Sequence, residues 1–172
     1  MQKRKLMGSL VAVAALVTGC ANQALAPGMS RDEVVSRLGT PTRVVPLAGG
    51  ERFQYSRQPY GRTTTMVDLD AAGRVVRARQ VLNLTDFNRI EIDRWSRDDI
   101  AREFGPPASV DHVGSWRGDI WNYYWFDGVN NMFFWVYLDA QGVVRRTQQG
   151  IELPREPDDR FSSSVMGRHH RQ

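Results

Sequence analysis

The sequence predicts an α+β fold made of two tandem modules, each a short helix or helical hairpin packed on a three-stranded antiparallel sheet. Two internal repeats predict this organisation. The segment 30–41 aligns without a gap with 96–107, and the turn-forming segment 69–73 recurs as 138–142. Because β-rich segments flank both copies of the turn, each repeat is expected to be one helix followed by a meander of three strands.

The first element of each repeat is a short capped helix. Ser30 and Ser96 are each followed three residues later by an acid, Glu33 or Asp99, which is the spacing of a capping box. The serine hydroxyl can accept a hydrogen bond from an early backbone N–H, and the carboxylate lies near the positive end of the helix dipole. An apolar pair at i and i+4 gives each helix one stripe to bury, Val34 with Leu38 and Ile100 with Phe104.

Glycine and proline predict where both helices end. Gly39 and Gly105 occupy the position at which a residue of positive φ closes a helix, and proline follows within two residues in each copy. A helix of only two turns is marginal in water by itself. Its apolar stripe must therefore be held against a larger element.

Three strands are predicted after each helix. A turn with aspartate and then glycine three residues later joins the second strand to the third, Asp70 to Gly73 and Asp139 to Gly142. A further helical turn is predicted at 85–90. Modules of fewer than about 70 residues rarely hold a sufficient core, so the two are expected to pack and unfold together. The predicted strands are 52–56, 63–69 and 75–82 in the first copy and 120–126, 132–138 and 143–149 in the second.

The N-terminal segment predicts export and lipid attachment. Basic residues at 3–5 precede an apolar run at 6–17 that is shorter than the ~20 residues needed to span a bilayer, which indicates a signal peptide. The segment 16–20 resembles the bacterial lipobox, whose cysteine is acylated and becomes the first residue of the mature chain. Cys20, the only cysteine, is therefore the predicted lipidation site, and acyl chains such as palmitate would anchor it permanently.

These patterns divide the chain into five segments. Because Ala21 and Asn22, rather than an aspartate, follow the cysteine, the lipid anchor is expected in the outer membrane, on its periplasmic face. The C-terminal segment is charged and has no apolar period, so it is predicted to be disordered. The predicted boundaries are a signal peptide at 1–19, a lipidated linker at 20–27, module 1 at 28–82, module 2 at 83–153 and a disordered tail at 154–172.

The charge of the mature chain excludes a nucleic-acid-binding function. The formal net charge is +4, but the basic residues at 3–5 belong to the predicted signal peptide, which leaves the mature chain near neutral. Such a chain presents no basic footprint for a phosphate backbone. With one cysteine the fold has no internal disulfide, so its stability must come from packing.

Alternation along the strands predicts an aromatic outer face on the second sheet. In the segment 63–69 the predicted core residues are Thr65, Val67 and Leu69, and the predicted outward residues are Thr64, Met66 and Asp68. The repeat then places Trp121, Tyr123, Phe134, Val136 and Leu138 in the core of the second module. The outward residues there are Ile120, Asn122, Tyr124, Phe126, Phe133, Trp135 and Tyr137.

The predicted partner-binding residues are the aromatic members of that outer face, Tyr124, Phe126, Phe133, Trp135 and Tyr137. Such a cluster exceeds the apolar patch of a few hundred Å² that monomers usually expose, so something is expected to cover it. The other module is one candidate, and a protein or lipid partner is the second. Because tyrosine and tryptophan anchor interfaces, the hypothesis is that Trp135 and Tyr137 hold a partner.

The sequence predicts no catalytic residue, no metal site and no cofactor. His112 follows Asp111 and is the one histidine outside the predicted tail, so a Ser-His-Asp arrangement would depend on that pair alone. A solvated loop histidine is the alternative. Helix capping already explains the paired acids of the two helices. The chain is therefore predicted not to be an enzyme, and no small-molecule substrate is expected.

The segment 27–41 resembles the signature of the SmpA/OmlA (BamE-like) outer-membrane lipoproteins. The matching residues are Pro27-Gly28-Met29-Ser30-Arg31-Asp32-Glu33-Val34 and Leu38-Gly39-Thr40-Pro41. The resemblance extends over 27–82 and, more loosely, over 84–151, where Arg94-Trp95 replaces Gly28-Met29. It implies a helical hairpin on a three-stranded sheet and a non-enzymatic accessory role in the machinery that inserts β-barrel proteins, with outer-membrane assembly proteins as partners.

The duplication itself resembles the tandem β-lactamase-inhibitor proteins, which are built from similar modules of helix and sheet. This second resemblance implies an alternative function. The chain would then be an inhibitor or ligand-binding lipoprotein that grips a periplasmic enzyme across the concave seam between its modules. The residues leave both functions open.

Overall fold

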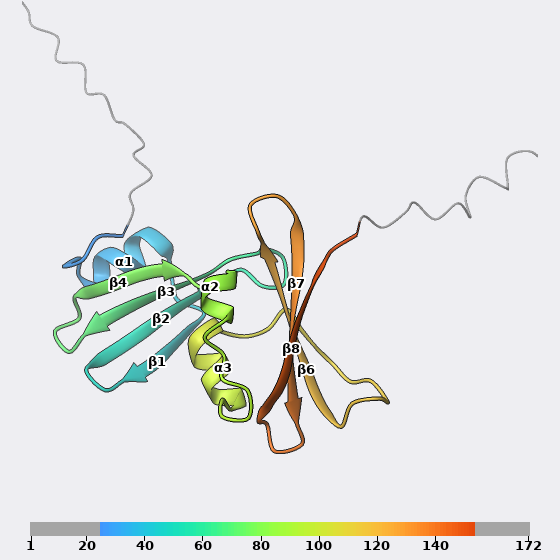
Figure 1. Ribbon diagram of the computed structural model, residues 1–172. Coiled ribbons are helices and arrows are strands. Elements are labelled where there is room, and N and C mark those ends of the chain that lie inside the picture. The colour runs from blue at the N-terminus through green and yellow to red at the C-terminus, as the bar shows by residue number, and fades with distance from the viewer. Residues whose placement is uncertain (1–24, 154–172) are drawn as a thin grey trace, which may run out of the picture.

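The computed structural model describes residues 25–153 (Figure 1). The predicted signal peptide 1–19, Cys20 and the predicted tail 154–172 lie outside this range. None of the helices between residues 25 and 153 has the length and apolar character needed to span a membrane. The elements in chain order are α1 (Arg31–Leu38), β1 (Arg43–Leu47), β2 (Gly50–Ser56), β3 (Thr64–Asp70), β4 (Val75–Gln80), α2 (Leu84–Phe87), α3 (Arg97–Phe104), β5 (Ser109–Asp111), β6 (Gly118–Phe126), β7 (Asn131–Asp139) and β8 (Val144–Ile151).

The predicted fold class is wrong, because the chain is mostly β and its sheets have four strands each. The strands are antiparallel and follow the orders β1-β2-β3-β4 and β5-β6-β7-β8. The prediction missed one edge strand per module. β1 contains Pro46, which cannot donate to a ladder and is tolerated only at a sheet edge, and β5 has just three residues. The helices are short, with eight residues in α1 and α3 and four in α2.

The predicted helix caps are confirmed in both copies. The Ser30 hydroxyl accepts from the Glu33 N–H at 3.2 Å, and the Glu33 carboxylate accepts from the Ser30 N–H at 2.7 Å. Ser96 and Asp99 repeat this pair at 3.2 and 2.8 Å. Hydrogen bonds from Ser30 hold the pKa of Glu33 below its ordinary value, which is the electrostatic counterpart of the cap. Both helices end at a glycine with a φ of 80°.

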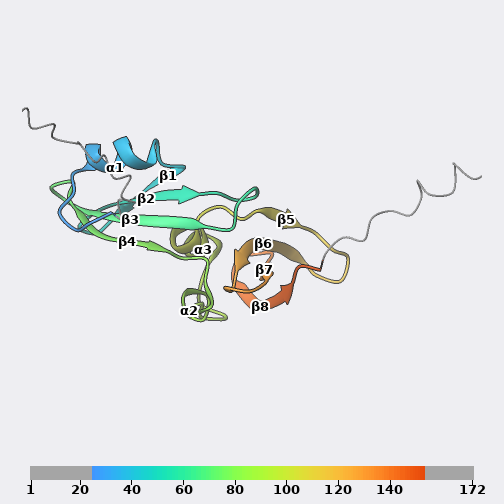
Figure 2. The ribbon, with the colours of Figure 1, turned by 90° about the horizontal axis from the view of Figure 1, so that it is seen from above.

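The helices and sheets form alternating layers. In Figures 1 and 2, α1 lies on one face of the first sheet, and α2 and α3 lie between that sheet and the second one. Val34 of α1 is buried in a small core with Phe53 and Leu69. Ile100 and Phe104 of α3 belong to a larger core on the inner face of the second sheet.

The second module covers the face of β3 that was predicted to point to solvent. Thr64 is 0 % exposed and Met66 is 1 % exposed, so their predicted outward position is wrong as a statement about exposure. Met66 packs in the core that contains Ile100 and Phe104. The alternation along the strand was read correctly, but both faces of this strand are covered, and Thr65, which was assigned to the core, is only half-buried.

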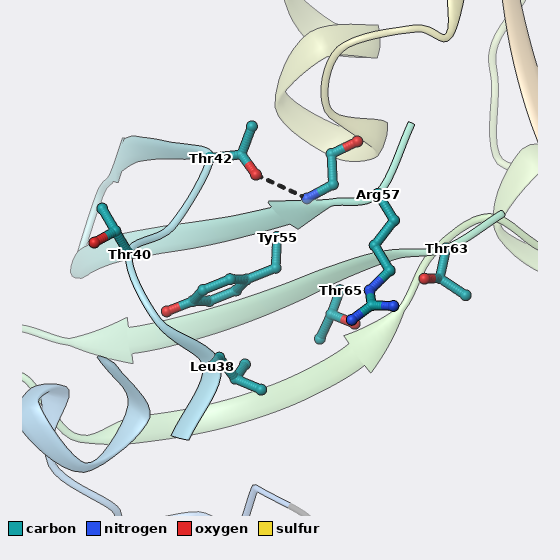
Figure 3. A pocket seen from close by; sticks show the side chains of 8 residues that line it. Leu38, Thr40, Thr42, Tyr55, Arg57, Thr63 and Thr65 are labelled. Carbon is teal, nitrogen blue, oxygen red and sulfur yellow. Dashed lines mark hydrogen bonds between the residues drawn. The ribbon is translucent and has the colours of Figure 1, made fainter. Parts of the chain in front are cut away.

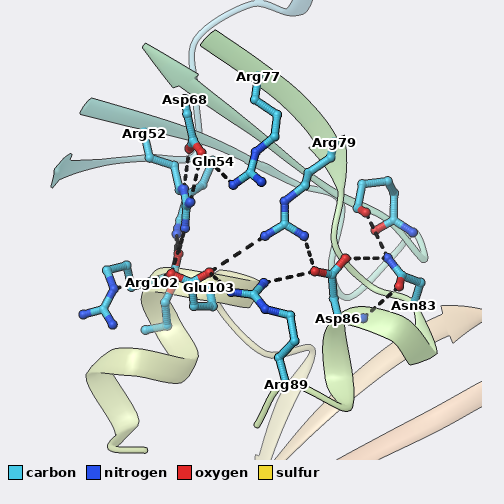
Figure 4. Close-up of polar contacts among 12 residues, drawn as sticks. Arg52, Gln54, Asp68, Arg77, Arg79, Asn83, Asp86, Arg89, Arg102 and Glu103 are labelled. Atoms are coloured by element: carbon cyan, nitrogen blue, oxygen red, sulfur yellow. Dashed lines mark hydrogen bonds and ion pairs between the residues drawn. The ribbon is translucent and has the colours of Figure 1, made fainter. Parts of the chain in front are cut away.

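A polar network joins the first sheet to α3 (Figure 4). The Arg52 guanidinium donates to Asp68 at 2.5 Å, to Glu103 at 3.1 Å and to the Arg102 carbonyl at 3.1 Å. The Gln54 amide donates to the Ala101 carbonyl at 2.9 Å and to the Arg102 carbonyl at 3.0 Å. Carbonyls in the last turn of a helix lack partners within the helix, so these side chains of the first module satisfy the Arg102 carbonyl. They also add a bond to the Ala101 carbonyl, which accepts from the Gly105 N–H at 3.1 Å.

The loop between β2 and β3 makes a second connection between the modules. The Gln58 side-chain amide donates to the Tyr124 carbonyl at 2.6 Å and accepts from the Tyr124 N–H at 3.1 Å. Gln58 thus continues the hydrogen bonding along β6 beyond Ser109, the first residue of β5. Arg62 of the same loop pairs with Glu152. These contacts join the two modules at a place separate from the polar network and from the core that contains Met66.

Candidate functional site

The five predicted aromatic residues lie on the outer face of the second sheet. Tyr124 of β6 is opposite Phe133 of β7, with their rings 5.4 Å apart and edge to face. The Phe133 ring is 5.6 Å from that of Trp135. Tyr124, Phe133, Trp135 and Tyr137 are half-buried, whereas Phe126, at the hairpin end of β6, is 52 % exposed. We call these five residues the aromatic face.

Two polar or aliphatic members of the same outer row are buried rather than exposed. Ile120 lies opposite Tyr137, and Asn122 lies opposite Trp135. Both are buried, so the predicted exposed position is wrong for them. The reason is β5, which was not predicted from the sequence. The Asn122 side-chain amide donates to the Ser109 hydroxyl of β5 at 2.9 Å and to the Asp111 carboxylate of β5 at 2.7 Å.

One end of the aromatic face forms a pocket with residues that the sequence analysis did not select. Trp116, from the loop between β5 and β6, has its ring 5.3 Å from that of Tyr137 and donates its indole N–H to the Leu138 carbonyl at 2.9 Å. The Arg146 guanidinium lies 3.9 Å from the centre of the Tyr137 ring and 5.7 Å from that of Trp116. The pocket has a volume of about 550 Å³, and Trp135 also lines it. We call this pocket the aromatic groove.

The strand register explains the position of Arg146 and could have revealed it. Arg146 of β8 is the cross-strand partner of Tyr137 in β7, and Gln148 is the partner of Trp135. The Tyr137 hydroxyl donates to the Gln148 side chain at 2.6 Å. Directly opposed residues share a face of the sheet, so a correct register would place Arg146 beside Tyr137. Trp116 carried no such signal, because it lies in a loop.

The first module covers only the opposite end of the aromatic face. The Arg62 guanidinium lies 5.6 Å from the centre of the Tyr124 ring, and Gln58 binds the backbone of Tyr124. Among residues 25–153, only residues of the second module line the groove around Trp135 and Tyr137. Intramolecular packing thus accounts for the Tyr124 end and leaves the groove open.

The groove combines ring faces with a small number of polar groups. Its apolar wall is formed by Trp116, Ile120, Trp135 and Tyr137, and its charged members are Arg146 and Asp111. Arg146 stacks on an aromatic ring and keeps guanidinium N–H groups available for acceptors. This arrangement can bind a ligand that offers an apolar group and a neighbouring hydrogen-bond acceptor.

His112 lies outside the aromatic groove and does not pair with its sequence neighbour Asp111. Its Nε2 atom is 2.9 Å from the Asp119 carboxylate, which also pairs with Arg97, and the His112 side chain is 71 % exposed. His112 is therefore a solvated loop histidine in the structure. His169 and His170 lie outside the described residues. Between residues 25 and 153, no three histidine, cysteine or acidic side chains gather as metal ligands would.

Comparison with known proteins leaves the family of this chain open. No protein-family model matches the chain, and no curated protein matches it. Among solved structures, the chain is similar to a DUF4309 family protein (YjgB) from Bacillus subtilis, with 12 % sequence identity and a TM-score of 0.29. The match covers 72 % of this chain and 78 % of that one. A similarity this low supports no statement about fold or function.

Proposed function

We propose that this protein is a lipid-anchored, non-enzymatic scaffold on the periplasmic face of the outer membrane, where the aromatic groove holds a protein of the β-barrel assembly machinery. The observation that carries the proposal is the groove itself. Trp116, Trp135 and Tyr137 form an aromatic surface that the first module leaves open. An uncovered aromatic surface on a sheet indicates a binding site for a partner.

The N-terminal sequence supports the cellular part of the proposal. The lipobox-like segment ending at Cys20 would tether the chain to a membrane, and the residues after the cysteine favour the outer one. The resemblance of 27–41 to the SmpA/OmlA lipoproteins points to the same compartment and supplies the proposed partner class. The helix α1 begins and ends within this segment.

The composition of the groove favours a protein as the partner. Tryptophan, tyrosine and arginine are the residues most enriched where truncation weakens protein interfaces. Here Trp135, Tyr137 and Arg146 meet in one pocket. Trp135 and Tyr137 are half-buried. Tyr137 is also held by its hydrogen bond to Gln148 and its ring contact with Trp116, so little of its side-chain entropy remains to be lost on binding.

Removing the two central rings tests the proposal. We expect the double variant Trp135→Ser/Tyr137→Ser to lose at least tenfold of its co-purification with the barrel-assembly complex from detergent-solubilised membranes, because hot-spot truncations typically weaken binding by about 2 kcal/mol or more each. The control is Tyr60→Ser, which removes an aromatic ring that is 99 % exposed and lies in the first module.

Circular dichroism separates a lost surface from a lost fold. Both rings lie on the outer face, so the double variant should keep the secondary structure of the native chain. Unchanged co-purification by a folded double variant would contradict the proposal. Groove-dependent capture of a soluble periplasmic enzyme would instead favour an inhibitor function. The inhibitor alternative was predicted to use the seam between the modules. That seam is filled, because Gln54, Thr64 and Met66 are buried there.

A further inference from the structure

A second pocket lies in the first module, between the end of α1 and the ends of β2 and β3 (Figure 3). Its volume is about 270 Å³. Apart from Leu38, its lining is polar and consists of hydroxyl side chains and one guanidinium. The polar lining residues are Thr40, Thr42, Tyr55, Ser56, Arg57, Thr63 and Thr65. We call it the hydroxyl pocket.

Local hydrogen bonds determine which hydroxyl groups of the pocket can donate to a ligand. The Ser56 N–H donates to the Thr42 hydroxyl at 3.0 Å, and the Gln58 N–H donates to the Ser56 hydroxyl at 3.2 Å. The Thr64 hydroxyl lies 3.5 Å from the Ser56 oxygen and donates to it. A hydroxyl whose oxygen already accepts still has its own hydrogen to donate. The Thr42 hydroxyl therefore keeps its hydrogen for a ligand, whereas the Ser56 hydroxyl lies with Thr64 on the opposite face of the sheet from Tyr55 and Thr65.

The charge of the hydroxyl pocket is positive and not compensated locally. Within the part of the chain that the structure describes, Arg57 is its one charged lining residue, and no carboxylate lines it. Among residues 25–153, none of the ion pairs involves Arg57. The carbonyl of Gly39, at the negative end of α1, accepts from the Tyr55 hydroxyl at 3.1 Å. This contact satisfies one carbonyl at the end of α1 and uses the only hydrogen of the Tyr55 hydroxyl.

We infer that the hydroxyl pocket binds a phosphate group. A guanidinium offers paired N–H donors that match two phosphate oxygens, and the surrounding hydroxyls can serve the others. A carboxylate has only two oxygens and would leave most of these donors unused. A neutral polyol would leave the charge of Arg57 without a partner. The inference is independent of the aromatic groove, which lies on the other module.

Calorimetric titration of the full-length chain in detergent tests this inference. The probes are inorganic phosphate, glycerol 3-phosphate and glycerol, of which the last two differ by the phosphate group alone. We expect saturable binding of both phosphates and none of glycerol. Tighter binding of inorganic phosphate would identify the free anion as the ligand, and tighter binding of glycerol 3-phosphate would identify an esterified phosphate such as a lipid headgroup.

Three variants complete the test. Arg57→Gln should weaken phosphate binding at least tenfold, because it removes the charge and the paired donors. Thr65→Val keeps the shape of the pocket and should weaken binding by about threefold through the loss of one hydroxyl. Arg117→Gln makes the same charge change at an exposed residue of the second module and should leave binding within twofold.

Three results would overturn the inference. They are the absence of saturable phosphate binding, equal binding of glycerol and glycerol 3-phosphate, and an unchanged affinity in a folded Arg57→Gln variant. Co-purification through the aromatic groove is measured in a separate experiment. The phosphate inference and the proposed function can therefore fail independently of each other.

Discussion

Replacing Arg52 by alanine is expected to lower the free energy of unfolding by about 3–5 kcal/mol, as measured by urea denaturation. Arg52 is only 5 % exposed and donates to two carboxylates, those of Asp68 and Glu103. Removal of the guanidinium takes the shortest contact from each carboxylate. It leaves Asp68 with Arg77 at 3.3 Å, and it leaves Glu103 with three arginines at 3.5 to 3.9 Å. The loss comes from the charged hydrogen bonds to Asp68 and Glu103, each worth about 1.5–3 kcal/mol.

Acidification supplies an internal check on this prediction. Burial raises the pKa of Asp68, but hydrogen bonds and charge from Arg52 and Arg77 outweigh it, so the pKa lies below its ordinary value. A depressed carboxyl pKa contributes stability that is present above the unfolded-state value of about 4 and is lost as the pH falls. The difference between the native chain and Arg52→Ala should therefore shrink below pH 4.

The control for Arg52 is Arg43→Ala, an exposed residue of the edge strand β1. A surface change of this kind should alter stability by less than about 0.5 kcal/mol. If Arg52→Ala lowered stability no more than Arg43→Ala does, the network of Figure 4 would not hold the modules together.

Replacing Phe104 by alanine is expected to lower the free energy of unfolding by about 3–5 kcal/mol. Phe104 is 1 % exposed, and its ring lies 5.2 Å from that of Phe87 and 6.2 Å from that of Tyr123. Its core also contains Met66 of the first module. A cavity at this position should therefore destabilise both modules at once and leave a single unfolding transition.

Two optical probes can follow the modules in that experiment. All five tryptophans lie between Trp95 and Trp135, so their fluorescence reports on the second module, whereas far-ultraviolet circular dichroism reports on both. The two urea transitions should coincide in the native chain and in Phe104→Ala. The control Val76→Ala changes an exposed side chain of β4 and should shift stability by less than about 0.5 kcal/mol. Separate transitions would show that the modules unfold independently.

Local patterns predicted the repeated helices because their signals lie within a few residues. Ser30 with Glu33 and Ser96 with Asp99 form the expected capping boxes, and alternation along β7 placed Phe134, Val136 and Leu138 correctly in the core. The edge strands were missed because β1 carries a proline and β5 is too short to show a period. Propensity is weak evidence for such strands, which depend on a neighbour to pair with.

Contacts between modules could not be read from either repeat. Met66 and Thr64 were placed outward because one covered face is the usual state of an antiparallel sheet, yet α3 covers the second face. The aromatic face was proposed from alternation alone. Trp116 and Arg146 were missing from it, because one lies in a loop and the other depends on a register that the sequence did not fix.

Intact-mass measurement of the protein purified from membranes tests the lipid-anchored scaffold most directly. The expected product lacks residues 1–19 and begins at Cys20 with acyl chains attached, and Cys20→Ala should abolish this modification. A membrane-purified chain that carries an unmodified Cys20, or that retains residues 1–19, would contradict the proposed anchor and with it the proposed place of action.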